Sequence, residues 1–140
     1  MIRKFVSNLN TITHLSIHKN GENILAGTKD GKVAWFQLDL SDKPYKIMEF
    51  HDDKIRSVAY HNNYPLMSSS SRNGKILIYH STVYDDLIQD PLIVPLKVLK
   101  QSDSGKLYYI NYLVVNSVVF HPKHPWVFSS GEDGLIRLWV

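Results

Sequence analysis

The fold of this protein is decided by the stretch Ser129-Ser130-Gly131-Glu132-Asp133-Gly134-Leu135-Ile136-Arg137-Leu138-Trp139. In it, an Asp-Gly pair separates a short run of small residues from an apolar run that ends in an aromatic residue. Such a pair between two runs is a strong signal for a β-hairpin, because glycine takes the positive φ that the tight turn requires. The same arrangement surrounds Asp30-Gly31 and Asn73-Gly74. The sequence therefore predicts one hairpin repeated three times.

The repeat extends beyond the hairpin, since a histidine precedes each copy and an aromatic residue closes it. The equivalent residues are His18, His61 and His121, then Gly31, Gly74 and Gly134, and finally Phe36, Tyr79 and Trp139. The first two histidines are about 43 residues apart, within the roughly 40–45 residues of one propeller blade. The interval to the third is longer by an insertion of about 17 residues.

Each copy is predicted to form short strands separated by turns. Three apolar runs surround the histidine and the glycine turn, and a fourth strand is predicted at residues 44–50 after the first copy and 95–99 after the second. Strands such as residues 76–79 are apolar at neighbouring positions, which favours sheets buried on both faces. No segment has a helical period. These features predict an all-β fold of about three four-stranded antiparallel blades.

These motifs resemble the WD40-repeat β-propeller family. The signature aspartate of that family falls at Asp30 and Asp133, with Asn73 in its place in the second copy, and the signature tryptophan survives at Trp139. His51 remains of the family's Gly-His dipeptide, and the resemblance implies a hydrogen-bond network around it. Structural roles are accordingly expected for Asp30, Gly31, His51, Ser70, Asn73, Gly74, Asp133, Gly134 and Trp139.

The repeat also divides the chain. Residues 1–9 are predicted to be the outer strand of a preceding blade, and residues 11–50 and 51–100 to be one blade each, the second with an insertion at 81–94. Residues 101–140 would form a last blade that lacks its outer strand. Closed propellers contain roughly 4–8 blades, so we expect the C-terminal arc of a larger ring, about seven-bladed as the resemblance implies.

A closer resemblance is carried by residues 41–46 and 83–99, most specifically by residues 91–99. They are similar to the C-terminal propeller of the block of proliferation family of eukaryotic ribosome biogenesis proteins. The resemblance implies a non-catalytic protein–protein interaction scaffold in large ribosomal subunit biogenesis and pre-rRNA processing, located in the nucleus, nucleolus and nucleoplasm. The implied partners are a pescadillo-like protein, a second WD-repeat protein with a ubiquitin-like domain, and the pre-60S particle. Residues 101–113 depart from the family pattern.

Composition limits the classes of function. The 140 residues include no cysteine, which excludes a disulfide scaffold, a cysteine zinc site and a thiol nucleophile. The net charge is +3 and the basic residues form no clustered stripe, so RNA contact stays open but is not supported by charge. The most apolar stretch, residues 107–119, is shorter than the about 20 residues of a membrane span, and no membrane partner is expected. The alternative function is a WD40 adaptor in chromatin or in substrate recruitment to a ubiquitin ligase.

No group of residues predicts catalysis, a metal site or a cofactor. His121 and His124 have a ligand-like spacing, but prolines interrupt the segment and no cysteine or helix supports a site. The run Ser68–Ser71 aligns with small residues in the other copies, which favours packing over a nucleophile. Asp85 and Asp86 are adjacent, so in an extended chain they point apart and make a poor acid–base pair. The protein is therefore predicted not to be an enzyme.

The insertion is the candidate segment for partner binding. It carries five large apolar residues, and their contiguous exposure would mark a partner site. They are Tyr84, Leu87, Ile88, Leu92 and Ile93. In the alternative interpretation, the segment folds back on its blade or forms one helical turn. The sequence supports both interpretations equally.

Overall fold

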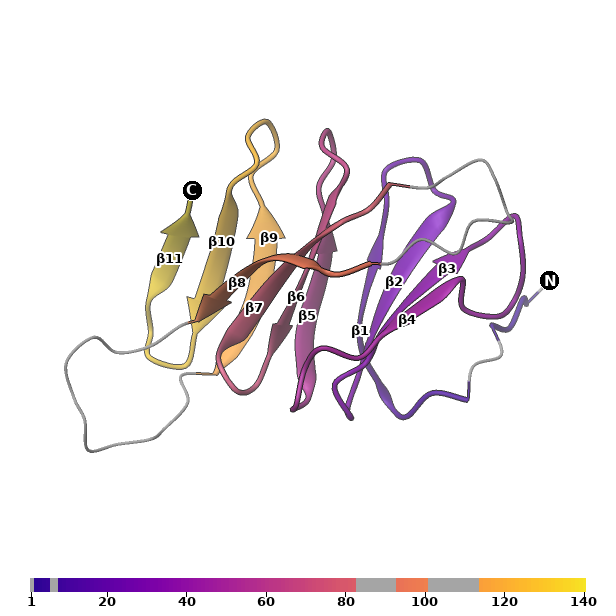
Figure 1. The fold of residues 1–140 in the computed structure, drawn as a ribbon, viewed down its shortest axis with the longest axis horizontal. Helices are drawn as coiled ribbons and strands as arrows, with labels where there is room; N and C mark the ends of the chain where they lie inside the picture. The colour runs from indigo at the N-terminus through magenta and orange to yellow at the C-terminus, as the bar shows by residue number, and fades with distance from the viewer. Residues whose placement is uncertain (1, 6–7, 83–92, 101–113) are drawn as a thin grey trace.

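A computed structural model describes residues 2–5, 8–82, 93–100 and 114–140 (Figure 1). Over these residues the chain forms strands and no helix, which confirms the all-β prediction. The strands are β1 (Ile12–Ile17), β2 (Asn23–Thr28), β3 (Val33–Gln37), β4 (Lys46–Met48), β5 (Ile55–Tyr60), β6 (Leu66–Ser71), β7 (Lys75–His80), β8 (Pro95–Lys100), β9 (Val115–Phe120), β10 (Val127–Gly131) and β11 (Ile136–Trp139). Within the described ranges, no helix is available that could cross a membrane.

Three antiparallel sheets stand side by side in chain order (Figure 1). Blade 1 is β1-β2-β3-β4, blade 2 is β5-β6-β7-β8, and the described part of blade 3 is β9-β10-β11. The strand register is the same in all three. Its repeating pairs are Leu15 with Ala26, Val58 with Ser69, and Val118 with Ser129. The gapless sequence repeat thus corresponds to one structural unit used three times.

The glycine turns have the geometry that the repeat predicts. Gly31, Gly74 and Gly134 have φ angles of 88°, 83° and 77°. Each glycine N–H donates to the carbonyl three residues earlier, as Gly74 does to Ser71 at 3.1 Å. Among the described residues, no residue other than glycine has a positive φ. The preceding Asp or Asn therefore keeps an ordinary backbone conformation, and glycine alone makes the turn.

The outer strands differ in part from the prediction. β8 occupies the expected segment, whereas β4 is shorter than the predicted 44–50. The described part of residues 1–9 forms no strand, because none of the described sheets offers it a free partner strand there. Instead Phe5 packs edge-on against Phe36 of blade 1, with ring centroids 5.7 Å apart.

The core lies between the blades. One cluster of buried side chains joins blades 1 and 2, and it contains Leu25, Val33, Trp35, Met48, Ile55, Val58, Tyr60, Met67, Leu77, Tyr79 and Ile93. A second cluster joins blades 2 and 3, and it contains Ala59, Ile76, Ile78, Leu99, Val115, Val118 and Val127. Blade 2 is therefore covered on both faces, as its continuous apolar strands predict.

Candidate functional site: polar networks, turns and open faces

Blade 2 carries a buried chain of polar side chains. His51 Nε2 lies 2.7 Å from Ser69 Oγ, which lies 3.0 Å from Tyr79 Oη. Burial lowers the pKa of His51 to about 4, and the charge of Lys75 adds to this. Burial also raises the pKa of Tyr79 to about 12. The three side chains form a buried hydrogen-bond network that links β6 and β7 to the segment before β5.

Ser70, which was expected to hold a structural position, does not join this network. Its Oγ is buried and has no partner among the described residues. Successive side chains in a strand point to opposite faces, so Ser69 faces His51 and Ser70 faces away from it. The hydroxyl that links the strands is therefore that of Ser69, and four consecutive serines give no sequence signal to choose between them.

The network changes from blade to blade. In blade 3, Trp139 Nε1 donates to Ser129 Oγ at 2.9 Å, the same pair of positions as Tyr79 and Ser69. Blade 1 has Ala26 and Phe36 at those positions, so it has no such bond. There the neighbouring Trp35 donates to Asn23 Oδ1 at 2.8 Å. Each blade thus ties its middle strands together by different chemistry.

The signature Asp and Asn residues stabilise the glycine turns. Asn73 Oδ1 accepts the N–H of Lys75 and Asp133 Oδ1 accepts that of Leu135, each at 3.2 Å. The Arg137 side chain bonds to the Asp133 carboxylate and holds the pKa of that carboxyl below its usual range. The Asn73 and Asp133 side chains thus each accept the backbone N–H of the residue two positions later, which is the ordinary role of Asn and Asp in turns.

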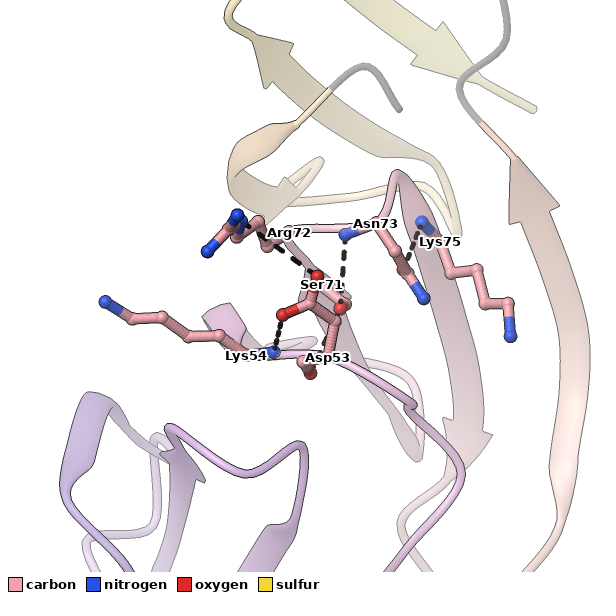
Figure 2. Close-up of polar contacts among 6 residues, drawn as sticks. All are labelled: Asp53, Lys54, Ser71, Arg72, Asn73 and Lys75. Carbon is pink, nitrogen blue, oxygen red and sulfur yellow. Dashed lines mark hydrogen bonds and ion pairs between the residues drawn. The ribbon is translucent and has the colours of Figure 1, made fainter. Parts of the chain in front are cut away.

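Figure 2 shows how the blade 2 turn is tied to the loop before β5. Ser71 Oγ donates to the Asp53 carbonyl at 3.1 Å, and Asp53 Oδ1 accepts the N–H of Lys54 at 2.7 Å. Arg72 lies 4.0 Å from the Asp53 carboxylate, where both side chains are largely exposed. The loop pair carries three cations, Lys54, Arg72 and Lys75, beside the carboxylates of Asp52 and Asp53.

The repeat histidines also have a structural role. The Nδ1 atom of His61 accepts the N–H of Asn63 at 2.9 Å, and its Nε2 lies 2.7 Å from the His124 carbonyl. Since Nδ1 accepts, Nε2 carries the proton and donates it. His121 Nδ1 likewise accepts two turn N–H groups, from Lys123 and His124. No group of three metal-ligating side chains occurs in the part of the chain that the structure describes.

The predicted binding segment is only partly visible. Tyr84, Leu87, Ile88 and Leu92 lie outside the described residues, and their role stays a prediction. Ile93 is 5% exposed and belongs to the core cluster between blades 1 and 2. Its inclusion among exposed binding residues was wrong, because the chain re-enters blade 2 just before β8 and buries this side chain.

Exposed apolar side chains gather on the outward faces of the two end blades. On blade 3 they are Val119, Ile136, Leu138 and Val140, and on blade 1 they are Ile12, Leu15 and Ile17. A cavity of about 280 Å³ opens on the blade 1 face, lined by Phe5, Ile12, Leu15, Ile24, Ala26 and Phe36. Exposed apolar side chains gathered in this way are typical of a face that packs against another sheet or another protein.

Family comparison matches residues 1–36, 42–80 and 106–140 to the family described as WD domain, G-beta repeat. The chain belongs to the WD40-repeat family. Each matched segment contains one glycine turn and covers most of one blade, so the WD40 repeat predicted from sequence is confirmed.

Three curated WD40 relatives share identity over the whole chain. It is 45% identical to the protein named Ribosome biogenesis protein bop1 of Danio rerio, 47% to the BOP1 homolog of Dictyostelium discoideum, and 42% to Ribosome biogenesis protein ERB1 of Candida albicans. The chain spans 17%, 16% and 16% of their lengths. The resemblance to this group of proteins is confirmed, and the match covers only a C-terminal part of them.

Proposed function

We propose that this chain acts in ribosome biogenesis, as a non-catalytic scaffold that presents propeller loops and faces to partner proteins. The observation that carries the proposal is the 42–47% identity over the whole chain to proteins named for ribosome biogenesis. A nuclear and nucleolar location follows from that role. The chain spans a small part of those relatives, and we propose that this part contributes binding surfaces on a rigid β-sheet framework.

The chemistry of the described residues supports a scaffold. The network serine Ser69 is fully buried, and its partner His51 is neutral and 7% exposed, so neither can meet a substrate. Ion pairs such as Lys75 with Asp52 lie on the surface and fasten loops. Binding proteins of this kind use loops on a rigid framework, with a few large side chains supplying most of the binding energy.

The finer proposal concerns the stage of ribosome biogenesis and the partner proteins. We infer that the chain serves large-subunit assembly and pre-rRNA processing within pre-60S particles. The proposed partners are a pescadillo-like protein and a second WD-repeat protein with a ubiquitin-like domain. Tyr84, Leu87, Ile88 and Leu92 of the insertion are the proposed contacts, since apolar residues on a connecting segment suit a partner site.

Affinity purification from eukaryotic cells tests this proposal. A tagged chain should recover large-subunit precursors together with both partners, and it should sediment with pre-60S particles. The variant Leu87→Ser/Ile88→Ser should lose them. Ile47→Ser is the matched control, because Ile47 is 45% exposed on β4, outside the insertion. Recovery of chromatin or ubiquitin-ligase components without pre-ribosomal particles would favour the adaptor alternative.

A further inference from the structure

Blade 2 ends in an outer strand that is longer than its counterpart in blade 1. β8 has six residues and pairs with β7 alone among the described strands, whereas β4 has three residues. Blade 2 lies between blades 1 and 3, and the chain continues on both sides of β8 (Figure 1). The free edge of β8 therefore belongs to the rim of the arc and not to one of its ends.

This edge is regular over part of its length. Pro95 has no N–H to donate, and the register with β7 shifts beside it, so that no residue of β7 stands opposite Leu96. From Lys97 to Lys100 the register has no break, and Lys100 stands opposite Lys75. Every second residue of an antiparallel edge strand directs its N–H and C=O away from its partner strand. The segment Lys97–Lys100 therefore offers backbone groups to an incoming strand.

The side chains of this segment alternate between two environments. Leu99 is buried in the cluster between blades 2 and 3. Val98 lies on the opposite face, beside its partner residue Leu77, and is 52% exposed. Lys97 and Lys100 are exposed, and neither has a carboxylate partner among the described residues. The edge thus presents an apolar side chain between two cations.

The two lysines determine which strand fits this edge. If two copies of the segment paired antiparallel about its centre, Lys97 of each copy would lie opposite Lys100 of the other, and like charges directly opposite one another are destabilising. Lysine on an edge strand is a common protection against such pairing. Acidic residues opposite the lysines have the reverse effect, because opposite charges across a strand pair attract. The charges therefore favour an acidic strand over a second copy of β8.

We propose that β8 is a docking edge for an extended acidic segment of a partner protein, which adds a further strand to blade 2. The segment pairs with Lys97–Lys100, carries an acidic residue opposite each lysine, and places apolar residues between them, beside Val98. In strand addition of this kind, backbone hydrogen bonds supply the affinity and side chains at alternate positions supply the specificity. The docking edge is separate from the insertion contacts proposed above, and the inference does not depend on a role in ribosome biogenesis.

A pair of probe peptides tests the charge preference. The complete protein is titrated with a short fluorescent peptide that has Glu-Val-Val-Glu at its centre, and with a counterpart that has Lys-Val-Val-Lys. The acidic peptide should bind about tenfold more tightly, because both of its carboxylates meet a lysine. Lys97→Glu/Lys100→Glu should reverse the preference. Equal binding of the two peptides, or binding of neither, overturns the proposal.

The matched control for the double substitution is Lys29→Glu/Lys43→Glu. It changes the net charge by the same amount at two exposed positions of blade 1, away from β8, and should leave the affinity for the acidic peptide unchanged. If this variant loses the acidic peptide as fully as Lys97→Glu/Lys100→Glu does, the peptide responds to net charge and not to β8, and the proposal fails.

N-methylation of the acidic peptide separates strand pairing from charge alone. Methylation of one alternate set of backbone nitrogens should abolish binding, whereas methylation of the other set, which faces away from β8, should be tolerated. The amides of residues 97–100 should also exchange more slowly with the peptide bound. Equal binding of both methylated peptides would show attraction by charge without strand pairing, and overturn the proposal.

Two other occupants of the edge would give distinct results. An oligouridine that binds more tightly than the acidic peptide, and is released by Lys97→Glu/Lys100→Glu, would assign the lysines to RNA. A complete protein that binds the peptide only after proteolytic trimming would show that its own chain covers the edge. Either result overturns the proposal of an acidic partner segment.

Discussion

Gly31 lies directly against the backbone of His51, so closely that a Cβ atom at Gly31 would stand 2.7 Å from the His51 carbonyl oxygen. It would also stand 3.0 Å from the carbonyl oxygen of Asp53. The turn of blade 1 thus rests on the loop that leads into blade 2. Gly134 holds the equivalent place in blade 3, and no atom of the described residues lies within 4 Å of a Cβ built there.

Alanine substitution should separate two reasons why glycine is needed in these turns, the positive φ and the close approach of neighbouring backbone. Gly134→Ala should cost about 1 kcal/mol, because only the positive φ disfavours a side chain. Gly31→Ala should cost about 1–3 kcal/mol more, since two backbone carbonyls must also move. Urea unfolding of both variants measures the difference. Equal losses would contradict the close contact between the blade 1 turn and the loop before β5.

Removal of the network hydroxyl should destabilise the protein. Ser69→Ala leaves His51 and Tyr79 without their shared partner, and we expect a loss of about 1–3 kcal/mol in the free energy of unfolding. Ser70→Ala is the matched control, because its buried Oγ has no described partner. Its effect should be near zero or stabilising. If Ser70→Ala cost as much as Ser69→Ala, the assignment of the network to Ser69 would fail.

Acid should weaken the fold through His51. Its folded pKa is about 4 and its ordinary value is 6.5, so between these values the unfolded chain binds a proton that the folded chain does not. This stability is fully present above pH 6.5 and is lost as pH falls toward 4. Its size is at most about 3 kcal/mol. Urea unfolding from pH 7 to 4.5 should show a shallower pH dependence in His51→Gln than in wild type. Parallel curves would contradict it.

Hydrogen exchange can detect the bond between blades 2 and 3. Ser57→Ala removes the acceptor of the Val118 N–H. The amide of Val118 should therefore exchange about fivefold faster, as expected for a bond worth about 1 kcal/mol. The control is Ser68→Ala, another buried serine in the same blade, whose Oγ has no described partner. Acceleration confined to β6 would speak against this inter-blade bond.

Much of the fold could be predicted because the repeat carries it. The positive φ needed at Gly31, Gly74 and Gly134 marks each hairpin in the sequence, and the equal spacing within each copy then aligns the strands. The outer strands were less predictable. Residues 2–5 have the composition of a strand, but strand formation also requires a neighbouring sheet edge, which sequence does not supply.

The polar contacts could be predicted less well. Ser69 could not be told from its neighbours, because four serines in a row hide the alternation of the strand. The side chains that accept hydrogen bonds between blades could not be predicted from the sequence for a different reason. His14 and Ser57 have unlike side chains, and their common role appears only when the backbone N–H of the next blade is in place. Ile93 looked exposed because insertions usually are, yet it closes the core beside β8.

The direction of the inter-blade bonds has a consequence for how damage spreads. His14 and Ser57 each satisfy a backbone N–H of the following blade and none of their own sheet. A substitution at such a position is therefore felt one blade downstream, toward the C-terminus, while the mutated sheet keeps its own ladder. Because each sheet contacts only its neighbours, the loss of one such acceptor weakens the contact with the following sheet and leaves the other contact intact.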